Sequence, residues 1–98
     1  MADITSTSNS RVKLARKLRR KRYRDQTGLC VLEGVRLVRD AWRAGAQFDA
    51  IFVVESLRST AAPADPAISL PDAMRAAGLP VFTVTDEVLA AIAETVAP

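Results

Sequence analysis

Histidine is absent from this 98-residue chain, and cysteine occurs only once, as Cys30. A single cysteine excludes an internal disulfide, and without histidine there is no Cys/His set for zinc and no imidazole for acid–base catalysis. Long apolar runs are missing as well, since none approaches the ~20 residues of a membrane-spanning helix and the N-terminus lacks the apolar stretch of a signal peptide. These absences predict a cytoplasmic protein with no metal site and no membrane partner.

Catalytic groups are equally scarce. The chain has no Ser/His/Asp set, no carboxylates paired at a convincing spacing and no glycine-rich cofactor loop. Its length fits one small domain, residues 1–98, with a single core. We therefore expect a binding module with no catalytic residues and no cofactor site of its own.

Positive charge is what the chain does have, and it is concentrated near the N-terminus. Nine of the 14 Lys and Arg residues lie between Arg11 and Arg24, and Asp3 is the only acid among the first 24 residues, so this segment carries +8. The remaining 74 residues carry −5. Charge gathered in one segment predicts where an anionic partner docks.

The basic segment has the pattern of one amphipathic helix. Ser8, Asn9 and Ser10 are candidate N-caps, the helix should run to about Arg24, and Gly28 is its natural stop. One helical face collects six basic residues, Lys13, Arg16, Lys17, Arg20, Lys21 and Arg24. The opposite half is apolar, with Val12, Leu14, Ala15, Leu18 and Tyr23. Such a helix can pack and bind at once.

Several interpretations of this basic face are open. Nucleic-acid binding is favoured because the charges follow the helical period and include many Arg, which grip phosphate bidentately. A solvated charged face without a ligand is the ordinary alternative. A membrane-surface helix is disfavoured because its apolar side offers no Phe or Trp anchor. The competing functional class is a protein-interaction or structural domain whose basic helix meets an acidic partner, and a self-contained enzyme is the weakest hypothesis.

Strand and helix patterns alternate through the rest of the chain. Strands are expected over residues 29–32, 48–54 and 81–84. Helices are expected over residues 35–44, 69–78 and 86–93, with a capping box of Ser69 and Asp72 before the second and Thr85 before the third. Residues 55–68 are predicted to form a flexible loop. The alternation predicts an α/β fold, a three-layer α/β/α sandwich around a mostly parallel central sheet.

Two single residues and one further cationic group are of interest. Cys30, inside an apolar run, is predicted to be an inert core residue, and Trp42 is also predicted to be core. Arg36, Arg39 and Arg43 follow the helical period on the second helix. They either extend the basic surface or lie solvated beside Asp40, and the sequence favours neither.

An ordered set of residues runs without gaps through the first half of the chain. It comprises Ser6, Asn9, Lys13, Leu18, Lys21, Arg24, Glu33 and Gly34, in the pattern S-x2-N-x3-K-x4-L-x2-K-x2-R-x8-E-G, followed by Arg36-Leu37-Val38 and Ala41. In this order the residues resemble the substrate-binding domain of SpoU-type (TrmH-like) RNA ribose methyltransferases. Beyond residue 45 the likeness rests on the order of strands and helices.

This resemblance implies a division of labour within a larger protein. The domain would be similar to small RNA-binding ribosomal proteins and would grip RNA, usually ribosomal, for a second domain with a trefoil knot. That second domain would bind S-adenosylmethionine, methylate a ribose 2′-hydroxyl and supply the contacts of a homodimer. Residues 94–98 resemble the linker that enters it, so this chain alone is expected to be inactive.

The resemblance also suggests roles for individual residues. Ser6 and Asn9 would shape the start of the first helix, and Lys13, Lys21 and Arg24 would contact the RNA backbone. Spacing alone adds the other basic residues of the same face, and the cations of the second helix are candidates. The predicted RNA-binding set is therefore Ser6, Asn9, Lys13, Arg16, Lys17, Arg20, Lys21, Arg24, Arg36 and Arg39.

Overall fold

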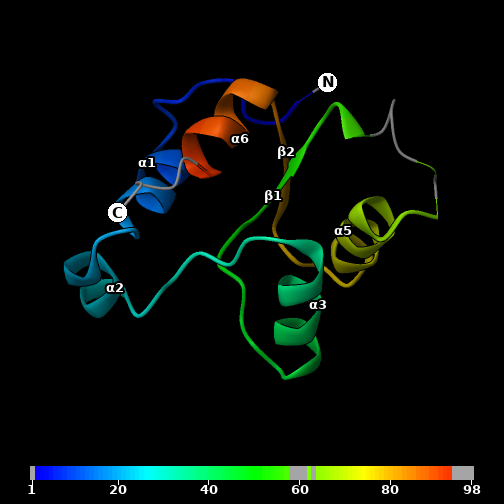
Figure 1. Ribbon diagram of the computed structural model, residues 1–98, viewed down its shortest axis with the longest axis horizontal. Coiled ribbons are helices and arrows are strands. Elements are labelled where there is room, and N and C mark those ends of the chain that lie inside the picture. Colours follow the sequence, from blue (N-terminus) through cyan, green and yellow to red (C-terminus); the bar gives the residue numbers. More distant parts are fainter. Residues whose placement is uncertain (1, 58–61, 63, 94–98) are drawn as a thin grey trace.

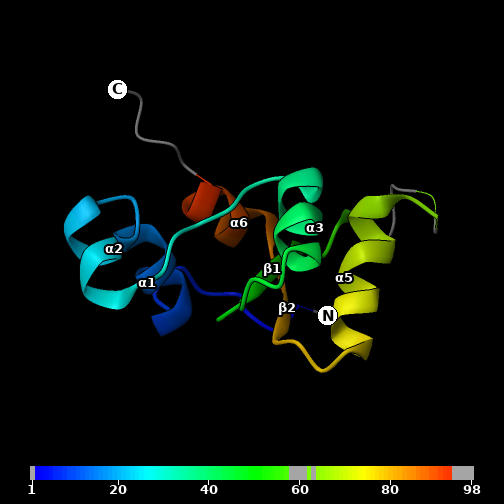
Figure 2. The ribbon, with the colours of Figure 1, turned by 90° about the horizontal axis from the view of Figure 1, so that it is seen from below.

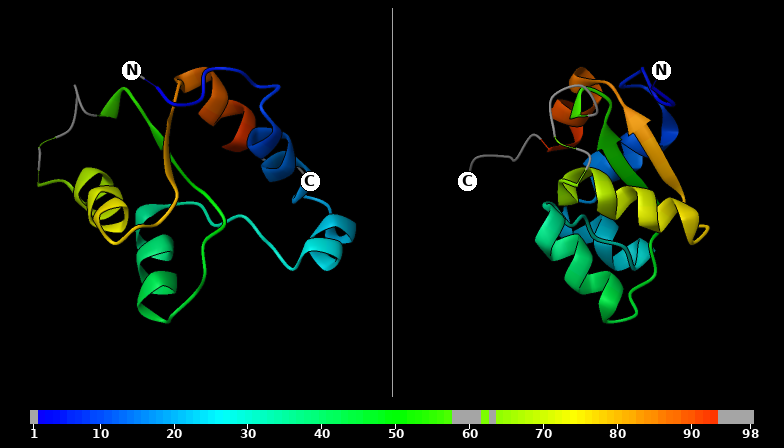
Figure 3. Two further views of the ribbon diagram at one scale, coloured as in Figure 1. Left: turned by 180° about the vertical axis from the view of Figure 1, so that it is seen from behind. Right: turned by 90° about the vertical axis from the view of Figure 1, so that its right-hand side faces the viewer.

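Helices lie on both sides of a small central sheet (Figure 1). The computed structural model describes residues 2–57, 62 and 64–93. Within them, five helices and a two-stranded parallel sheet form a small α/β domain. The elements are α1 (Ser10–Lys17), α2 (Lys21–Thr27), α3 (Val35–Arg43), β1 (Ile51–Val54), α5 (Pro66–Ala76), β2 (Val81–Val84) and α6 (Asp86–Ala93). Helices α1 and α6 lie on one side of the sheet and α3 and α5 on the other, as the view from behind also shows (Figure 3).

The sheet joins segments that are far apart in the sequence. β1 and β2 pair in parallel along their whole lengths, as the β-α-β order predicted, although β1 is shorter than the predicted strand over residues 48–54. Ile4 makes an isolated parallel bridge to Val84, so the N-terminal segment lies along the edge of β2 that β1 leaves free. Asp3 adds a side-chain bond there, because its Oδ2 accepts from the Thr83 amide (2.9 Å) and hydroxyl (3.0 Å).

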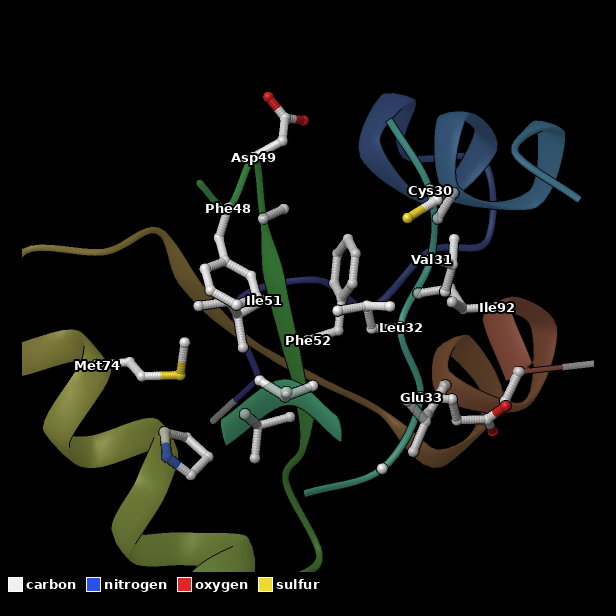
Figure 4. Close-up of a pocket in the computed structure, with 18 of the residues that line it drawn as sticks. Cys30, Val31, Leu32, Glu33, Phe48, Asp49, Ile51, Phe52, Met74 and Ile92 are labelled. Atoms are coloured by element: carbon white, nitrogen blue, oxygen red, sulfur yellow. The ribbon is translucent and has the colours of Figure 1, made fainter. Parts of the chain in front are cut away.

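The predicted strand over residues 29–32 is wrong. This segment is extended but forms no ladder with β1 or β2. In the close-up of the adjoining cavity, the Phe52 ring lies between β1 and this segment, beside Leu32 and Ile92 (Figure 4). Side chains thus separate the two backbones, and an apolar run of strand length does not by itself provide a paired edge.

The predicted single helix from the N-cap to Arg24 is also wrong. α1 begins where expected, with Asn9 as N-cap and its Oδ1 accepting from the Arg11 amide at 2.9 Å. The helix ends at Lys17 with Leu18 as its C-cap, and α2 starts after Arg20, whose backbone is extended. The predicted stop is confirmed, because Gly28 caps α2 in the left-handed conformation at φ 71°. A continuous basic face over both helices therefore does not exist.

The break has a physical cause in two arginines. Arg24 Nη1 donates to the carbonyls of Leu18 (2.9 Å) and Arg19 (2.6 Å), oxygens that a continuous helix would keep for its own amides. Arg19 Nη2 reaches α6 and donates to the carbonyls of Ala91 (2.8 Å) and Ile92 (3.0 Å). Repulsion between like charges at i, i+4 spacing further weakens an uninterrupted helix.

Helix α5 starts earlier than the capping box predicted. Asp65 is its N-cap, with Oδ1 accepting from the Ala67 amide at 2.8 Å, and Pro66 occupies the first helical position. Ser69 and Pro71 consequently lie inside the helix, so the capping box is wrong and the predicted loop over 55–68 is shorter. Residues 58–61 and 63 of that loop lie outside the described residues.

The other helix ends agree with the sequence. Gly34 precedes α3 with φ 104°, a conformation that glycine adopts without strain. Thr85 Oγ1 accepts from the Val88 amide at 3.2 Å at the start of α6. The start of α3 depends on Gly34 and the start of α6 on Thr85, so each could be predicted from one local residue.

The core lies where α1 and α6 meet β2. Its buried cluster is Ile4, Val12, Ala15, Val84, Val88 and Ile92, with Phe52, Phe82 and Leu89 packed against it. Burying such apolar area is the main stabilising contribution in a domain of this size. Cys30 is exposed, so its prediction as a core residue is wrong, because the segment that carries it does not enter the sheet. Trp42 is half-buried on α3.

Candidate nucleic-acid interface

Helix α1 presents cations on a surface that the core holds in place. Val12 and Ala15 are buried against α6, while Lys13, Arg16 and Lys17 are exposed. Within the described residues, Lys13 and Arg16 make no side-chain hydrogen bond or ion pair. Arg16 and Lys17 lie in the last turn, where the helix dipole favours positive charge. α1 therefore offers positive charge that the described part of the protein leaves unneutralised.

The residues before α1 form a turn of short polar side chains. The Ser6 and Ser8 hydroxyls lie 2.7 Å apart, and the Ser8 amide donates to Ser6 Oγ at 3.1 Å. Asn9 then caps the helix. Ser6 and Asn9 thus set the geometry with which α1 starts.

The cations of the 18–24 region divide into two kinds. Arg19 and Arg24 are half-buried and bond to backbone carbonyls, so part of the basic charge serves the fold. Arg20 is exposed and has no such bond among the described residues. Lys21 pairs with Asp25 at 2.7 Å, but both side chains are well exposed, and such surface pairs contribute little.

Tyr23 is the meeting point of α1 and α2. Lys17 Nζ of α1 lies 5.7 Å from the centroid of its ring, and Arg22 Cζ lies 4.8 Å from it. Arg22 Nη2 also donates to the phenol oxygen at 2.9 Å. That hydrogen bond, then the Arg22 charge, and more weakly Lys17 and Arg20, lower the pKa of Tyr23 below 10.0. A single aromatic ring is thus surrounded by positive charge.

Arg11 makes a third cation–π contact, at the start of α1. Its Cζ lies 4.7 Å from the centroid of the Phe82 ring on β2. Because Phe82 packs against the core cluster, this contact fixes Arg11 beside the sheet. Arg11, Arg22 and Tyr23 are absent from the sequence-predicted set; the alternation of Tyr23 with basic neighbours in KRYR is the signal that points to two of them.

The α3 arginines lie elsewhere. In two perpendicular views α3 is well separated from α2 and belongs to the opposite side of the sheet from α1 (Figures 1 and 2). Arg36 is exposed, and Arg39 Nε lies 3.7 Å from Asp40 Oδ1. The structure therefore places Lys17 and Arg20 near Tyr23 at the corner between α1 and α2 but leaves Arg36 and Arg39 apart from them.

The main cavity has a different character from this basic surface. It measures about 460 Å³ and lies between the extended segment, β1 and helices α3, α5 and α6. Figure 4 shows apolar side chains along it, with Asp49 and Glu33 at opposite ends. Among residues 2–57, 62 and 64–93, no group of three His, Cys, Asp or Glu residues could hold a metal ion. In the same residues no helix is long and apolar enough to cross a bilayer.

A comparison with models of known protein families identifies one family that matches most of the chain. Residues 9–98 match the model of the MRM3-like substrate binding domain. Searches of curated proteins and of solved structures give no match. The matched region contains both α1 and α2 and extends over the sheet, and the sequence resemblance to SpoU-type enzymes is thereby confirmed.

Proposed function

The chain belongs to the MRM3-like substrate binding domains, the N-terminal RNA-binding domains of SpoU/TrmH-type rRNA methyltransferases, and from this membership we propose how it binds. It holds structured ribosomal RNA on α1 and on the corner between α1 and α2. It thereby delivers the RNA to an S-adenosylmethionine-dependent 2′-O-ribose methyltransferase domain of the parent protein, a homodimer.

The proposal depends on a set of positively charged side chains that have no acidic partner among the described residues. Lys13, Arg16 and Arg20 are exposed and have no acidic partner among the described residues. Lys13 and Arg16 stand on a helix whose other side is buried, so ordering them for a ligand requires little further loss of backbone freedom. Phosphates would neutralise these charges and release condensed counterions.

Each residue of the predicted set has its own part in the proposal. Ser6 and Asn9 position the first turn of α1. Arg24, with Nη1 engaged by two carbonyls, keeps other nitrogens for a phosphate while it holds the corner together. Direct backbone contacts are assigned to Lys13, Arg16, Lys17, Arg20 and Lys21.

Arg36 and Arg39 form a separate part of the proposal. Their distance from α2 (Figure 2) means that one RNA must be extended or folded to touch both places. An RNA that contacts α3 as well as α1 and α2 would therefore cover a large part of the protein surface. An RNA that contacts only α1 and α2 would cover a small part of it.

The described residues do not fit S-adenosylmethionine. The cavity walls are mainly apolar, its two acids lie at opposite ends, and Gly34 has no second glycine near it to form a phosphate- or cofactor-binding loop. We assign cofactor and methyl transfer to the catalytic domain of the parent protein. Helices on both sides of a parallel sheet (Figure 3) support a three-layer sandwich similar to small RNA-binding ribosomal proteins.

Removal of two unpaired cations tests the proposal. The double variant Lys13→Ala/Arg16→Ala should bind a ribosomal RNA fragment more weakly and reduce the slope of log K against log salt by about 1.5, since each lost phosphate contact contributes roughly 0.7 to 0.9. Filter binding at four salt concentrations measures both quantities.

A matched variant controls for net charge. Arg43→Ala/Arg75→Ala removes the same charge from α3 and α5 and should leave the slope unchanged. Circular dichroism should show the same thermal midpoint for both variants. Equal salt slopes for the two variants, or displacement of the RNA by an acidic protein at equal concentration, would contradict the proposal.

A further inference from the structure

Tyr23 is the one aromatic residue placed on the exposed basic helix. Phe52 and Phe82 pack against the core cluster, whereas α2 contributes no buried residue and Tyr23 is half-buried. Its ring lies close to the cations of Lys17 and Arg22, and its hydroxyl accepts a hydrogen bond from Arg22. A ring that stabilised the fold by burial would instead be packed among apolar side chains.

An aromatic ring with two cations close to it matches the chemistry of an unpaired nucleotide. Every nucleobase has a π-face that stacks on Tyr, and the phosphates on either side of that base carry the charge that Lys and Arg neutralise. Inside a duplex no base face is free, because each base pair is stacked between its neighbours. The cluster therefore discriminates between classes of RNA in a way that scattered cations cannot.

We propose that Tyr23 is a stacking platform for an unpaired RNA base, with Lys17 and Arg22 holding the phosphates beside it. This rests on the proposed RNA-binding function and deepens it, because it makes the substrate an RNA with a loop, bulge or single-stranded end. On binding, the two cations exchange their contacts with Tyr23 for the phosphates and leave the ring to the base. The lowered pKa of the phenol agrees with cations this close.

A competing explanation is that Tyr23 serves only as a clip between α1 and α2. Its contact with Lys17 of α1 gives this explanation substance. The two differ in what Tyr23→Leu does, since leucine keeps apolar volume but has no stacking face. If Tyr23 only connects the two helices, Tyr23→Leu changes the shape of the corner and weakens the binding of every RNA. If Tyr23 stacks on a base, Tyr23→Leu weakens the binding only of RNAs with an unpaired base.

The experiment uses the 98-residue chain and two RNA probes of equal length. One is a hairpin with 2-aminopurine in its loop, and the other is a blunt duplex with 2-aminopurine paired in the stem. For the hairpin, Tyr23→Leu should weaken binding by about five- to 150-fold, the range that corresponds to the loss of one base–aromatic stacking contact. Tyr23→Phe, which keeps the ring and loses the hydroxyl, should bind the hairpin within about threefold of the native chain. For the duplex, both variants should match the native chain.

Fluorescence identifies the stacked base directly. The native chain and Tyr23→Phe should quench the loop 2-aminopurine, and Tyr23→Leu should not. Equal loss on hairpin and duplex, or unchanged quenching by Tyr23→Leu, would overturn the platform while leaving RNA binding intact. No binding of either probe by the native chain would instead overturn the proposed function itself. Circular dichroism of each variant establishes that the fold is retained.

Discussion

Helices α1 and α2 are neighbours and both carry a net positive charge, yet they are attached to the molecule in different ways. α1 buries Val12 and Ala15 against the core, whereas α2 buries nothing and is joined to α1 by the Arg24–carbonyl bonds and the Tyr23 cluster. The same residue types are thus left exposed and without an acidic partner on α1, whereas at the start of α2 they replace hydrophobic packing. Positive charge in a sequence does not say which of the two it does.

The largest effect on stability is expected from removing the buried apolar side chain at the end of α1, because α1, unlike α2, is held by apolar burial. Leu18 is 6% exposed, so Leu18→Ala should lower the free energy of unfolding by about 2–5 kcal/mol through lost burial and a cavity. Urea denaturation followed by Trp42 fluorescence measures it. Gln26→Ala on the exposed α2 should change it by less than about 0.5 kcal/mol; similar losses for both would contradict the difference between the helices.

A second change removes the polar attachment. Arg24→Met keeps the length of the side chain but loses its bonds to the Leu18 and Arg19 carbonyls, so the expected loss of stability is about 1–2 kcal/mol at this half-buried site. Hydrogen exchange of α2 amides should accelerate more than that of α1 amides. Arg20→Met, which breaks no side-chain bond to the described residues, is the matched control, and equal acceleration in both variants would show that the Arg24 bonds do not hold α2.

The smallest expected effect distinguishes two acids, Asp3 beside β2 and Asp25 on α2. Thr83 donates to Asp3 from its backbone and its hydroxyl, and these bonds hold the pKa of Asp3 below its ordinary 3.8. A lowered pKa in the folded state contributes stability above about pH 3.8 that is lost as the pH falls through the folded value. Asp3→Asn should therefore be less stable than the native chain at pH 6, with the difference shrinking below pH 4.

Asp25 provides the comparison for that measurement. Its pair with Lys21 is well exposed, so Asp25→Asn should change stability little at either pH. Thermal midpoints at pH 3 and pH 6 decide the matter. A stability difference for Asp3→Asn that is as large at pH 3 as at pH 6 would mean that the Thr83 bonds do not favour the ionised form.

Features set by adjacent residues could be predicted from the sequence. Asn9 as N-cap, Gly28 as stop, Thr85 before α6 and the strand at 81–84 depend on local backbone and side-chain chemistry. The Asp65-Pro66 start of α5 is equally local, but the capping-box pattern at Ser69 predicts a later start, which is wrong. Local rules fail here only where two candidate signals are close together.

Features set by distant residues could not be predicted. The break after α1 depends on Arg19 reaching the last turn of α6 and on Arg24 turning back, which no period in the segment reveals. The fate of residues 29–32 depends on which side chain lies beside β1. For the interface, the pattern identified the basic segment but treated Tyr23 as an apolar position, because a helical wheel assumes one unbroken helix.

The bonds from Arg19 to the carbonyls of Ala91 and Ile92 have a mechanical meaning. They fasten the basic corner to the final turn of α6, which already packs against α1. Helices α1 and α6 are thereby joined by side-chain hydrogen bonds as well as by apolar packing. Moving the corner between α1 and α2 relative to α6 therefore requires breaking both Arg19 hydrogen bonds.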